Sequence, residues 1–326
     1  MATTHLLGRF DVRDPAGPRF AWPGSAIAAT FTGTGITAQL RDSGTSYFAV
    51  VIDGAAPAVV RTRRSTRAYV LASGLPAGTH TVTLTKRTES NQGVVQLLGL
   101  TPVGGALVPS PAPFTRRIEV VGDSITCGYG VLGAGPACHF TAGTEDATVS
   151  YAALAAAQLH AQATLVAFSG LGLIRDYGGS RVNQMPVRFG LALADDPTSV
   201  WAFDAPPPDV VVVHLGTNDF VAGDPGPAFQ TAYVAFVRQL RQRYSSAHVV
   251  CALNPLTTGH ARDQARAYIE GAVAELVAAG DARVTFLELD EPLASEGYGC
   301  DYHPSATTHR TMAAKLVAEI QALTGW

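Results

Sequence analysis

The first hundred residues consist of short apolar runs, rich in β-branched and aromatic side chains, with no helical period. The run HTVTLTKR (His80–Arg87) alternates apolar and polar positions, as in a strand that packs on one face and is wet on the other. Turn signals such as TGTG, DGAAP, GLPAG and SNQG separate the runs. We predict an all-β sandwich or jelly roll with strands at Ala26–Phe31, Ile36–Leu40, Tyr47–Asp53, Ala68–Ser73, His80–Arg87 and Val94–Leu100.

After Phe114 the apolar runs become nearly continuous and alternate with stretches of helical period. Strands of that kind are buried on both faces, and their alternation with helices is typical of a parallel α/β sheet. The predicted strands are Arg117–Gly122, Ala163–Phe168, Asp209–Gly216, His248–Asn254 and Arg283–Leu289. The predicted helices are Val149–His160, Pro227–Tyr244, Arg262–Ala279 and Ala306–Leu323.

The stretch between the two patterns, TPVGGALVPSPAPF, carries four prolines and has no periodicity, which is typical of a linker. We therefore expect two domains in the 326 residues. The predicted boundaries are a β domain at residues 1–101, a Pro-rich linker at 102–114 and an α/β domain at 115–326.

Composition and charge narrow the class of protein. An apolar fraction of 47% and a charged fraction of 15% are those of a globular chain. The net charge of -3, without a long run of one sign, gives no reason to expect nucleic acid or an anionic membrane as partner. The N-terminus, MATTHLLGRF, has no basic segment followed by an apolar one, so no signal peptide is visible and the cellular location stays open.

The four cysteines are Cys127, Cys138, Cys251 and Cys300. They form no CxxC pair and no Cys/His cluster with zinc spacing, so we expect no bound metal. Cys127 and Cys138 flank a loop rich in glycine and proline. A local disulfide between them and two free thiols are both compatible with the sequence.

Chemically reactive residues follow several of the α/β strands. Ser124 follows the first strand, Gly170 the second and Asn218 the third, and His303 lies past the fifth. In parallel sheets ligands bind beyond the carboxyl ends of the strands, so these residues should meet at one edge. A hydroxyl, a base and polar N–H donors are the parts of acyl transfer. Taken alone, Ser124 would also fit a helix cap.

The motifs GDSITCGYG, SGLGLIRDYGG, LGTND and CDYHPS occur in this order at the strand ends. In this set the chain resembles the SGNH (GDSL-type) hydrolases. Within them it is most similar to carbohydrate esterase family 2, whose members carry a jelly-roll domain before the hydrolase domain. The resemblance implies a three-layer, flavodoxin-like α/β domain with a five-stranded parallel sheet, and it implies an enzyme without a metal or another cofactor.

The same resemblance implies roles for four residues. Ser124 would be the nucleophile, and His303 would be the base that later protonates the leaving alcohol. The oxyanion hole would consist of the backbone N–H groups of Ser124 and Gly170 and the side-chain amide of Asn218. Asp219, beside Asn218, is predicted to tie its loop down.

One position departs from the family pattern. Most SGNH enzymes place an aspartate three residues before the histidine, and this chain has Cys300 there. The nearest acid is Asp301, two residues before His303, which is the candidate for the third member of a triad. The resemblance also allows a Ser-His dyad, because carbohydrate esterase family 2 includes members that work with one.

Other residues carry open alternatives. Tyr177, Trp201 and Tyr302 are predicted to stack on sugar rings, with packing at the rim or in the core as the alternative. His309 shares a helical stripe with Met312, Leu316 and Ile320, and His214 lies inside an apolar strand; both are expected to be core histidines.

The resulting hypothesis is a serine esterase that removes O-acetyl groups from acetylated xylan, glucomannan or their oligosaccharides. A short-chain esterase for another small acylated metabolite is the first alternative. The second is a carbohydrate-binding protein with a vestigial site. By family resemblance the protein would be secreted, and the oligomeric state is undetermined.

Overall fold

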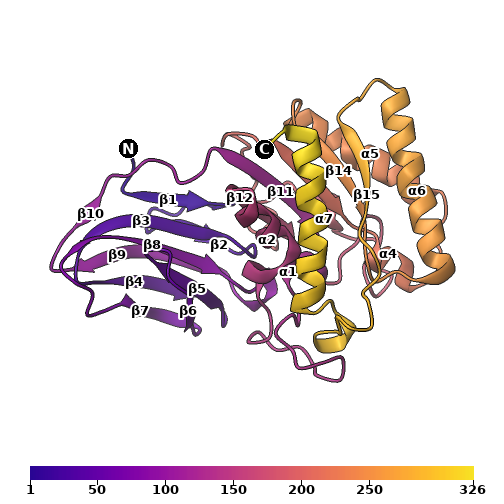
Figure 1. Ribbon diagram of the computed structural model, residues 1–326. Coiled ribbons are helices and arrows are strands. Elements are labelled where there is room, and N and C mark those ends of the chain that lie inside the picture. Colours follow the sequence, from indigo (N-terminus) through magenta and orange to yellow (C-terminus); the bar gives the residue numbers. More distant parts are fainter. The chain divides into compact units, whose positions relative to one another are not determined.

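The computed structural model describes residues 1–326, and the chain divides into two compact units (Figure 1). The first unit comprises Met1–Thr115 together with Leu191–Trp201. The second unit comprises Arg116–Gly190 and Ala202–Trp326. Each unit is described by itself below.

The first unit consists of two sheets in which every strand pairing is antiparallel. One sheet has the order β1-β3-β8-β5-β6, with β10 also paired to β3, and the other has the order β2-β9-β4-β7. The strands of the first sheet are β1 (Thr4–Leu7), β3 (Ala26–Gly33), β8 (Gly78–Lys86), β5 (Tyr47–Ile52), β6 (Ala58–Arg61) and β10 (Leu107–Val108). Those of the second are β2 (Arg19–Phe20), β9 (Val95–Val103), β4 (Gly35–Asp42) and β7 (Ser65–Ala72), and a single 3-10 turn, η1 (Ser90–Gln92), precedes β9.

A single apolar core lies between these two sheets. Strands β3 and β4 alternate buried and half-buried positions along their length, because successive side chains point to opposite faces. Phe31 from β3 and Phe48 from β5 meet Leu40 from β4 and Val95 from β9 in that core. The predicted β-sandwich is therefore confirmed.

All six strands predicted for this part of the chain are present, and four short ones were missed. β1, β2, β6 and β10 have two to four residues, too few for an alternating pattern to stand out. Residues 102–114, predicted as a linker, hold the end of β9 and all of β10, where Leu107 pairs with Phe31. The segment Leu191–Trp201 returns to the first unit from within the second, which no local pattern indicates.

The second unit contains a parallel five-stranded sheet in the order β12-β11-β13-β14-β15. Its strands are β11 (Arg116–Gly122), β12 (Ala161–Ala167), β13 (Val210–His214), β14 (His248–Leu253) and β15 (Val284–Glu288). This is the flavodoxin-like strand order, as predicted. The order reverses beside β11, so the chain leaves β11 and β13 on either side of a topological switch point, where such folds bind ligands.

Helices cover both faces of this sheet (Figure 1). On one face α2 (Tyr151–Gln158) packs with α7 (Ala306–Thr324) over Val120, Val212 and Val250. On the other, α5 (Ala228–Arg243) packs beside α6 (Gly259–Ala278), and Tyr233 of α5 donates a hydrogen bond to the carbonyl of Val213. The remaining helices are single turns: α1 (Ser124–Cys127), η2 (Ala147–Val149), α3 (Met185–Arg188), α4 (Thr217–Val221) and η3 (Cys300–Tyr302). None of the helices is both long enough and apolar enough to span a membrane.

Candidate active site

The carboxyl edge of the parallel sheet brings the predicted residues together. Gly122, the last residue of β11, is in register with Ala167 of β12 on one side and His214 of β13 on the other. The turns that follow these three strands therefore lie next to one another, and they carry Ser124, Gly170 and Asn218. His303 reaches the same edge from the loop that precedes α7.

Ser124 is the first residue of the single-turn helix α1. Asp123 caps this helix, because its carboxylate accepts a hydrogen bond from the backbone N–H of Ile125 at 3.0 Å. The strand can turn so sharply because residue 122 is glycine: a Cβ there would lie 2.1 Å from Oγ1 of Thr126. The turn delivers the Ser124 hydroxyl to the sheet edge, where its Oγ lies 2.9 Å from Nε2 of His303.

The other ring nitrogen of His303 fixes the tautomer. Nδ1 lies 3.2 Å from the backbone carbonyl of Asp301, and a carbonyl can only accept, so Nδ1 carries the proton. Nε2 is then unprotonated and can accept a proton from Ser124. Burial lowers the pKa of His303, which favours this neutral form of the ring.

The carboxylate of Asp301 points to other partners. It accepts hydrogen bonds from the Tyr129 hydroxyl at 3.1 Å, from the Phe140 backbone N–H at 2.9 Å and from Nδ1 of His139 at 3.0 Å. These bonds, the one from His139 foremost, lower the pKa of Asp301. The structure therefore places the backbone of Asp301 on the imidazole of His303, and not its side chain. The arrangement is a dyad, and a third-member role for the Asp301 carboxylate has no support in this geometry.

Three N–H donors lie along the edge. The N–H of Ser124 is in the first turn of α1, where the helix provides no acceptor, and the N–H of Gly170 donates to no group in the chain. Gly170 has a φ of +81°, a conformation that favours glycine. The side-chain nitrogen of Asn218 donates to the carbonyl of Leu171 at 2.8 Å, which fixes the amide and leaves its second N–H for a ligand.

Asp219 holds the loop that carries Gly170. Its carboxylate accepts hydrogen bonds from the backbone N–H groups of Leu173, Ile174 and Arg175 at 2.8 to 3.1 Å. The loop approaches so closely that a Cβ at Gly172 would lie 2.4 Å from Oδ2 of Asp219. The expectation that Asp219 ties this loop down is confirmed.

The aromatic residues predicted to bind sugar have different surroundings. Tyr177 is exposed in the loop after Gly170, to whose carbonyl its backbone N–H donates. Tyr302 is exposed beside His303 and meets Tyr298 edge-on, with 5.9 Å between ring centres. Tyr298 and Tyr302 line a hollow of about 250 Å³, together with Pro255, Leu256, Thr258, Glu291, Pro292 and Asp301. Trp201 belongs to the first unit, where the Arg9 guanidinium lies 5.6 Å from its ring centre.

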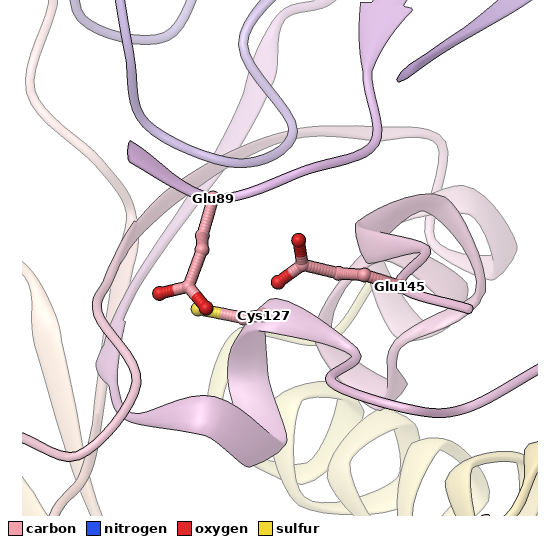
Figure 2. A group of neighbouring side chains, drawn as sticks. All are labelled: Glu89, Cys127 and Glu145. Carbon is pink, nitrogen blue, oxygen red and sulfur yellow. The ribbon is translucent and has the colours of Figure 1, made fainter. Parts of the chain in front are cut away.

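The cysteines pair differently from the local alternative. Cys138 is bonded to Cys300, and Cys127 is buried and forms no disulfide, so both alternatives, a Cys127–Cys138 disulfide and two free thiols at these positions, are wrong. The bridge joins positions 162 residues apart, which no local spacing reveals. Figure 2 shows Cys127 at the end of α1 and Glu145 in the loop ahead of η2, both in the second unit.

Two buried histidines lie beneath the site, and they are core histidines as predicted. Nδ1 of His309 accepts a hydrogen bond from the backbone N–H of Tyr151, and His214 meets the Tyr151 ring edge-on. Burial lowers the pKa of each histidine to about 3, so both rings are neutral.

Sequence reasoning missed Tyr129, His139 and Phe140. The Tyr129 ring lies against the His303 ring with 4.1 Å between their centres, and Phe140 stacks on the other side of Tyr129 at 4.2 Å. Tyr129 lies within the motif GDSITCGYG, so the signal was present. His139 and Phe140 have no comparable signal, because their contacts arise from a loop far from His303 in sequence.

Comparison with known proteins decides the family. The model "Carbohydrate esterase 2 N-terminal" matches residues 6–111, and the model "GDSL-like Lipase/Acylhydrolase family" matches residues 120–311. A family two carbohydrate esterase from Clostridium thermocellum, solved with cellohexaose, is 38% identical with a TM-score of 0.95, over 99% of both chains. The chain belongs to carbohydrate esterase family 2. The predicted resemblance, the two-domain fold and the assignment to carboxylic ester hydrolases are confirmed.

Other relatives of this family 2 esterase differ in length. The cellulase/esterase CelE of Acetivibrio thermocellus is 38% identical over 98% of this chain, which spans only 39% of CelE. An acetylxylan esterase/glucomannan deacetylase of Cellvibrio japonicus is 29% identical, and 98% of this chain covers 89% of it. A family two carbohydrate esterase structure from Cellvibrio japonicus has a TM-score of 0.91 at 28% identity, over 99% of this chain and 96% of that one.

Proposed function

We propose that this family 2 esterase removes acetyl groups from the hydroxyls of acetylated xylan, glucomannan or their oligosaccharides, through an acyl-enzyme on Ser124. The observation that carries the proposal is the Ser124–His303 pair, 2.9 Å apart, with Nδ1 of His303 held by a carbonyl. The names of the relatives, an acetylxylan esterase/glucomannan deacetylase among them, support this class of substrate.

In the first half of the reaction, Oγ of Ser124 attacks the carbonyl carbon of the acetyl ester. Nε2 of His303 takes the hydroxyl proton, which turns a weak nucleophile into an effective one. Negative charge then develops on the former carbonyl oxygen. The N–H groups of Ser124 and Gly170 and the free N–H of Asn218 would stabilise that oxyanion, because they are already in place and need no reorganisation.

In the second half, the tetrahedral intermediate collapses and its bond to the sugar oxygen breaks. The imidazolium of His303 gives its proton to that oxygen, and the deacetylated sugar leaves. His303 next removes a proton from water, which attacks the carbonyl carbon of the acetyl-Ser124 ester. The bond to Oγ of Ser124 then breaks, acetate leaves, and the imidazolium of His303 returns its proton to Oγ, which restores both residues. These steps use only side chains, backbone N–H groups and water, and the proposal includes no cofactor.

The sugar itself would lie over the exposed aromatic rings. Tyr302 directly precedes the base in sequence, is exposed and lines the hollow described above, so it is the proposed platform for the sugar next to the scissile ester. Tyr177, whose backbone N–H donates to the carbonyl of the proposed oxyanion donor Gly170, remains a predicted contact on the same chemical ground.

The test is acetate release from acetylated xylan, acetylated glucomannan and small acetylated sugars, with p-nitrophenyl acetate as a general ester. We expect release from at least one polysaccharide and none by Ser124→Ala. Hydrolysis of p-nitrophenyl acetate without acetate release from any carbohydrate would favour the alternative, an esterase for another acylated metabolite. Carbohydrate binding with no hydrolysis of any ester would favour the vestigial site.

A further inference from the structure

The position that most SGNH enzymes give to the orienting aspartate is occupied here by Cys300, and Cys300 is covalently bonded to Cys138. Cys138 lies in the glycine-rich loop, Tyr129–Phe140, which follows the helix that bears Ser124. Cys300 lies in the base turn, Gly299–His303, which ends in the catalytic base. The disulfide therefore joins the segment after the nucleophile to the segment that carries the base.

Backbone hydrogen bonds connect the same two segments at close spacing. The N–H of Cys300 donates to the carbonyl of Gly130 at 3.0 Å, and the N–H of Asp301 donates to the carbonyl of Cys138 at 2.9 Å. Within the base turn, the N–H of His303 donates to the carbonyl of Cys300 at 3.0 Å. Asp301, whose carbonyl accepts from Nδ1 of His303, follows the disulfide-bonded Cys300 directly. Its position is therefore fixed by the disulfide and by these backbone hydrogen bonds.

Two glycines make room for the bridge. A Cβ at Gly133 would lie 2.3 Å from Sγ of Cys300 and 2.4 Å from Sγ of Cys138. A Cβ at Gly130 would lie 2.8 Å from Cβ of Cys300. Contacts this short leave no space for a side chain, so the glycine-rich loop accommodates the disulfide specifically.

The base turn needs such a constraint because its backbone is strained. Asp301 and Tyr302 are consecutive non-glycine residues with φ of +52° and +61°, in the left-handed region that such residues rarely adopt. Residues in this region persist only where the surrounding structure holds them there. If the turn relaxed, the carbonyl of Asp301 would rotate away from Nδ1, and His303 would lose both its tautomer and its direction.

We propose that the Cys138–Cys300 disulfide positions His303, in the place of the aspartate side chain that orients the base in a triad, so that full esterase activity requires the oxidised bridge. This inference rests on the proposed function for its kinetic readout. Cys138 and Cys300 are positioning residues, since they act through the carbonyl of Asp301 and touch no substrate.

The decisive comparison is the wild type against Cys138→Ser/Cys300→Ser, assayed on p-nitrophenyl acetate. We expect kcat to fall about tenfold to a hundredfold with little change in KM, because a misdirected base slows the chemical step and leaves ester binding intact. The acid limb of the kcat/KM profile should move to higher pH, because a looser His303 is better solvated and its pKa returns toward the ordinary value. A merely less stable protein, assayed well below its unfolding temperature, would keep the limb in place.

Reduction supplies an independent test of the same bond. Dithiothreitol transfers two electrons and two protons to the disulfide, which yields thiols at Cys138 and Cys300 and oxidised cyclic dithiothreitol. Wild type should lose kcat to the level of the double variant, and the double variant should not respond. Cys251→Ala, which removes a buried free thiol of β14, is the matched control and should respond to dithiothreitol as wild type does.

A glycine variant tests the same inference without removing the cysteines, and an NMR titration of His303 tests it without relying on activity. Gly133→Ala retains both cysteines and should reproduce the loss of kcat, because its methyl group displaces the bridge. The ring-proton resonances of His303, titrated by NMR, should give a higher pKa in the double variant than in wild type, and this readout does not depend on activity. Wild-type kcat and an unchanged His303 titration in the double variant would overturn the inference. A wild type inactive on all acetate esters, with the NMR shift present, would instead overturn only the proposed function.

Discussion

Each residue of the dyad has an aspartate close by in sequence, and the two aspartates have opposite surroundings. Asp123, next to Ser124, is completely buried, and burial raises its pKa to about 7. Asp301, two residues before His303, is partly exposed, and its hydrogen bonds from His139, Phe140 and Tyr129 lower its pKa. Neither carboxylate contacts the imidazole.

The difference shows how a carboxylate can serve a site without taking part in the reaction. Asp123 caps the helix that begins at Ser124, and its cost is a charge in the protein interior near Asp219. Asp301 fixes the glycine-rich loop against the base turn, at little cost because water reaches it. The first aspartate makes the stability of the fold depend on pH, and the second, whose pKa is lowered, keeps its charge and its hydrogen bonds to lower pH than a free carboxyl would.

The largest expected effects belong to the dyad itself. Ser124→Ala and His303→Ala should each lower kcat on p-nitrophenyl acetate by roughly a thousandfold or more, because the nucleophile or its base is lost. Circular dichroism of each purified variant checks that it is folded. A folded Ser124→Ala enzyme with wild-type kcat would show that Ser124 is not the nucleophile.

The next largest effect is expected in the pH dependence of folding stability, to which Asp123 contributes. Its folded pKa of about 7 lies above the ordinary value of 3.8, so the folded state holds the proton more tightly and stability falls as pH rises between these values. Asp123→Asn keeps an acceptor for the Ile125 N–H and cannot ionise. Between pH 4 and pH 8 the variant should therefore lose less stability than wild type, by about 4 kcal/mol for a shift of roughly three units.

Chemical denaturation at each pH measures this difference. Wild type and variant share every other titrating group, the core histidines included, so the contributions of those groups to the pH dependence cancel in the difference. Parallel curves for wild type and variant would mean that Asp123 is ionised in the folded state with no penalty.

A smaller effect is expected for the other aspartate. Asp301→Asn retains the backbone carbonyl that holds His303, so kcat should fall by about tenfold or less, in contrast to the roughly ten-thousandfold loss expected when a true triad aspartate is replaced. The measurement is kcat on p-nitrophenyl acetate, with His139→Ala as the matched control, since it removes one donor to the same carboxylate. If folded Asp301→Asn were as inactive as His303→Ala, the carboxylate would be the orienting group and the dyad interpretation would fail.

The smallest effect concerns metals, where no change is expected. Incubation with EDTA should leave kcat on p-nitrophenyl acetate as it was, because the proposed steps use protein groups and water alone. Loss of activity on chelation, restored by zinc, would show that a metal takes part and that both aspartates need another interpretation.

The sequence was most informative where chemistry follows a strand. Parallel strands end at one edge, so Ser124, Gly170, Asn218 and His303 could be predicted to meet from their order alone. It was least informative where contact depends on distant loops. The Cys138–Cys300 bridge and the contacts of His139 and Phe140 with the Asp301 carboxylate arise from segments about 160 residues apart, which leave no local pattern.

The short segment Leu191–Trp201 has a consequence for how this polypeptide is synthesised and for how its gene could be divided. The chain passes between the units at three places, near residues 115, 190 and 201, so neither unit is encoded by one uninterrupted stretch. A ribosome must extend the chain past Trp201 before the β-sandwich has all its parts, because Trp22 and Arg13 bond to carbonyls of this late segment. Recombination that exchanges such units as modules would therefore have to carry both together, and a gene divided at residue 115 would yield two incomplete products.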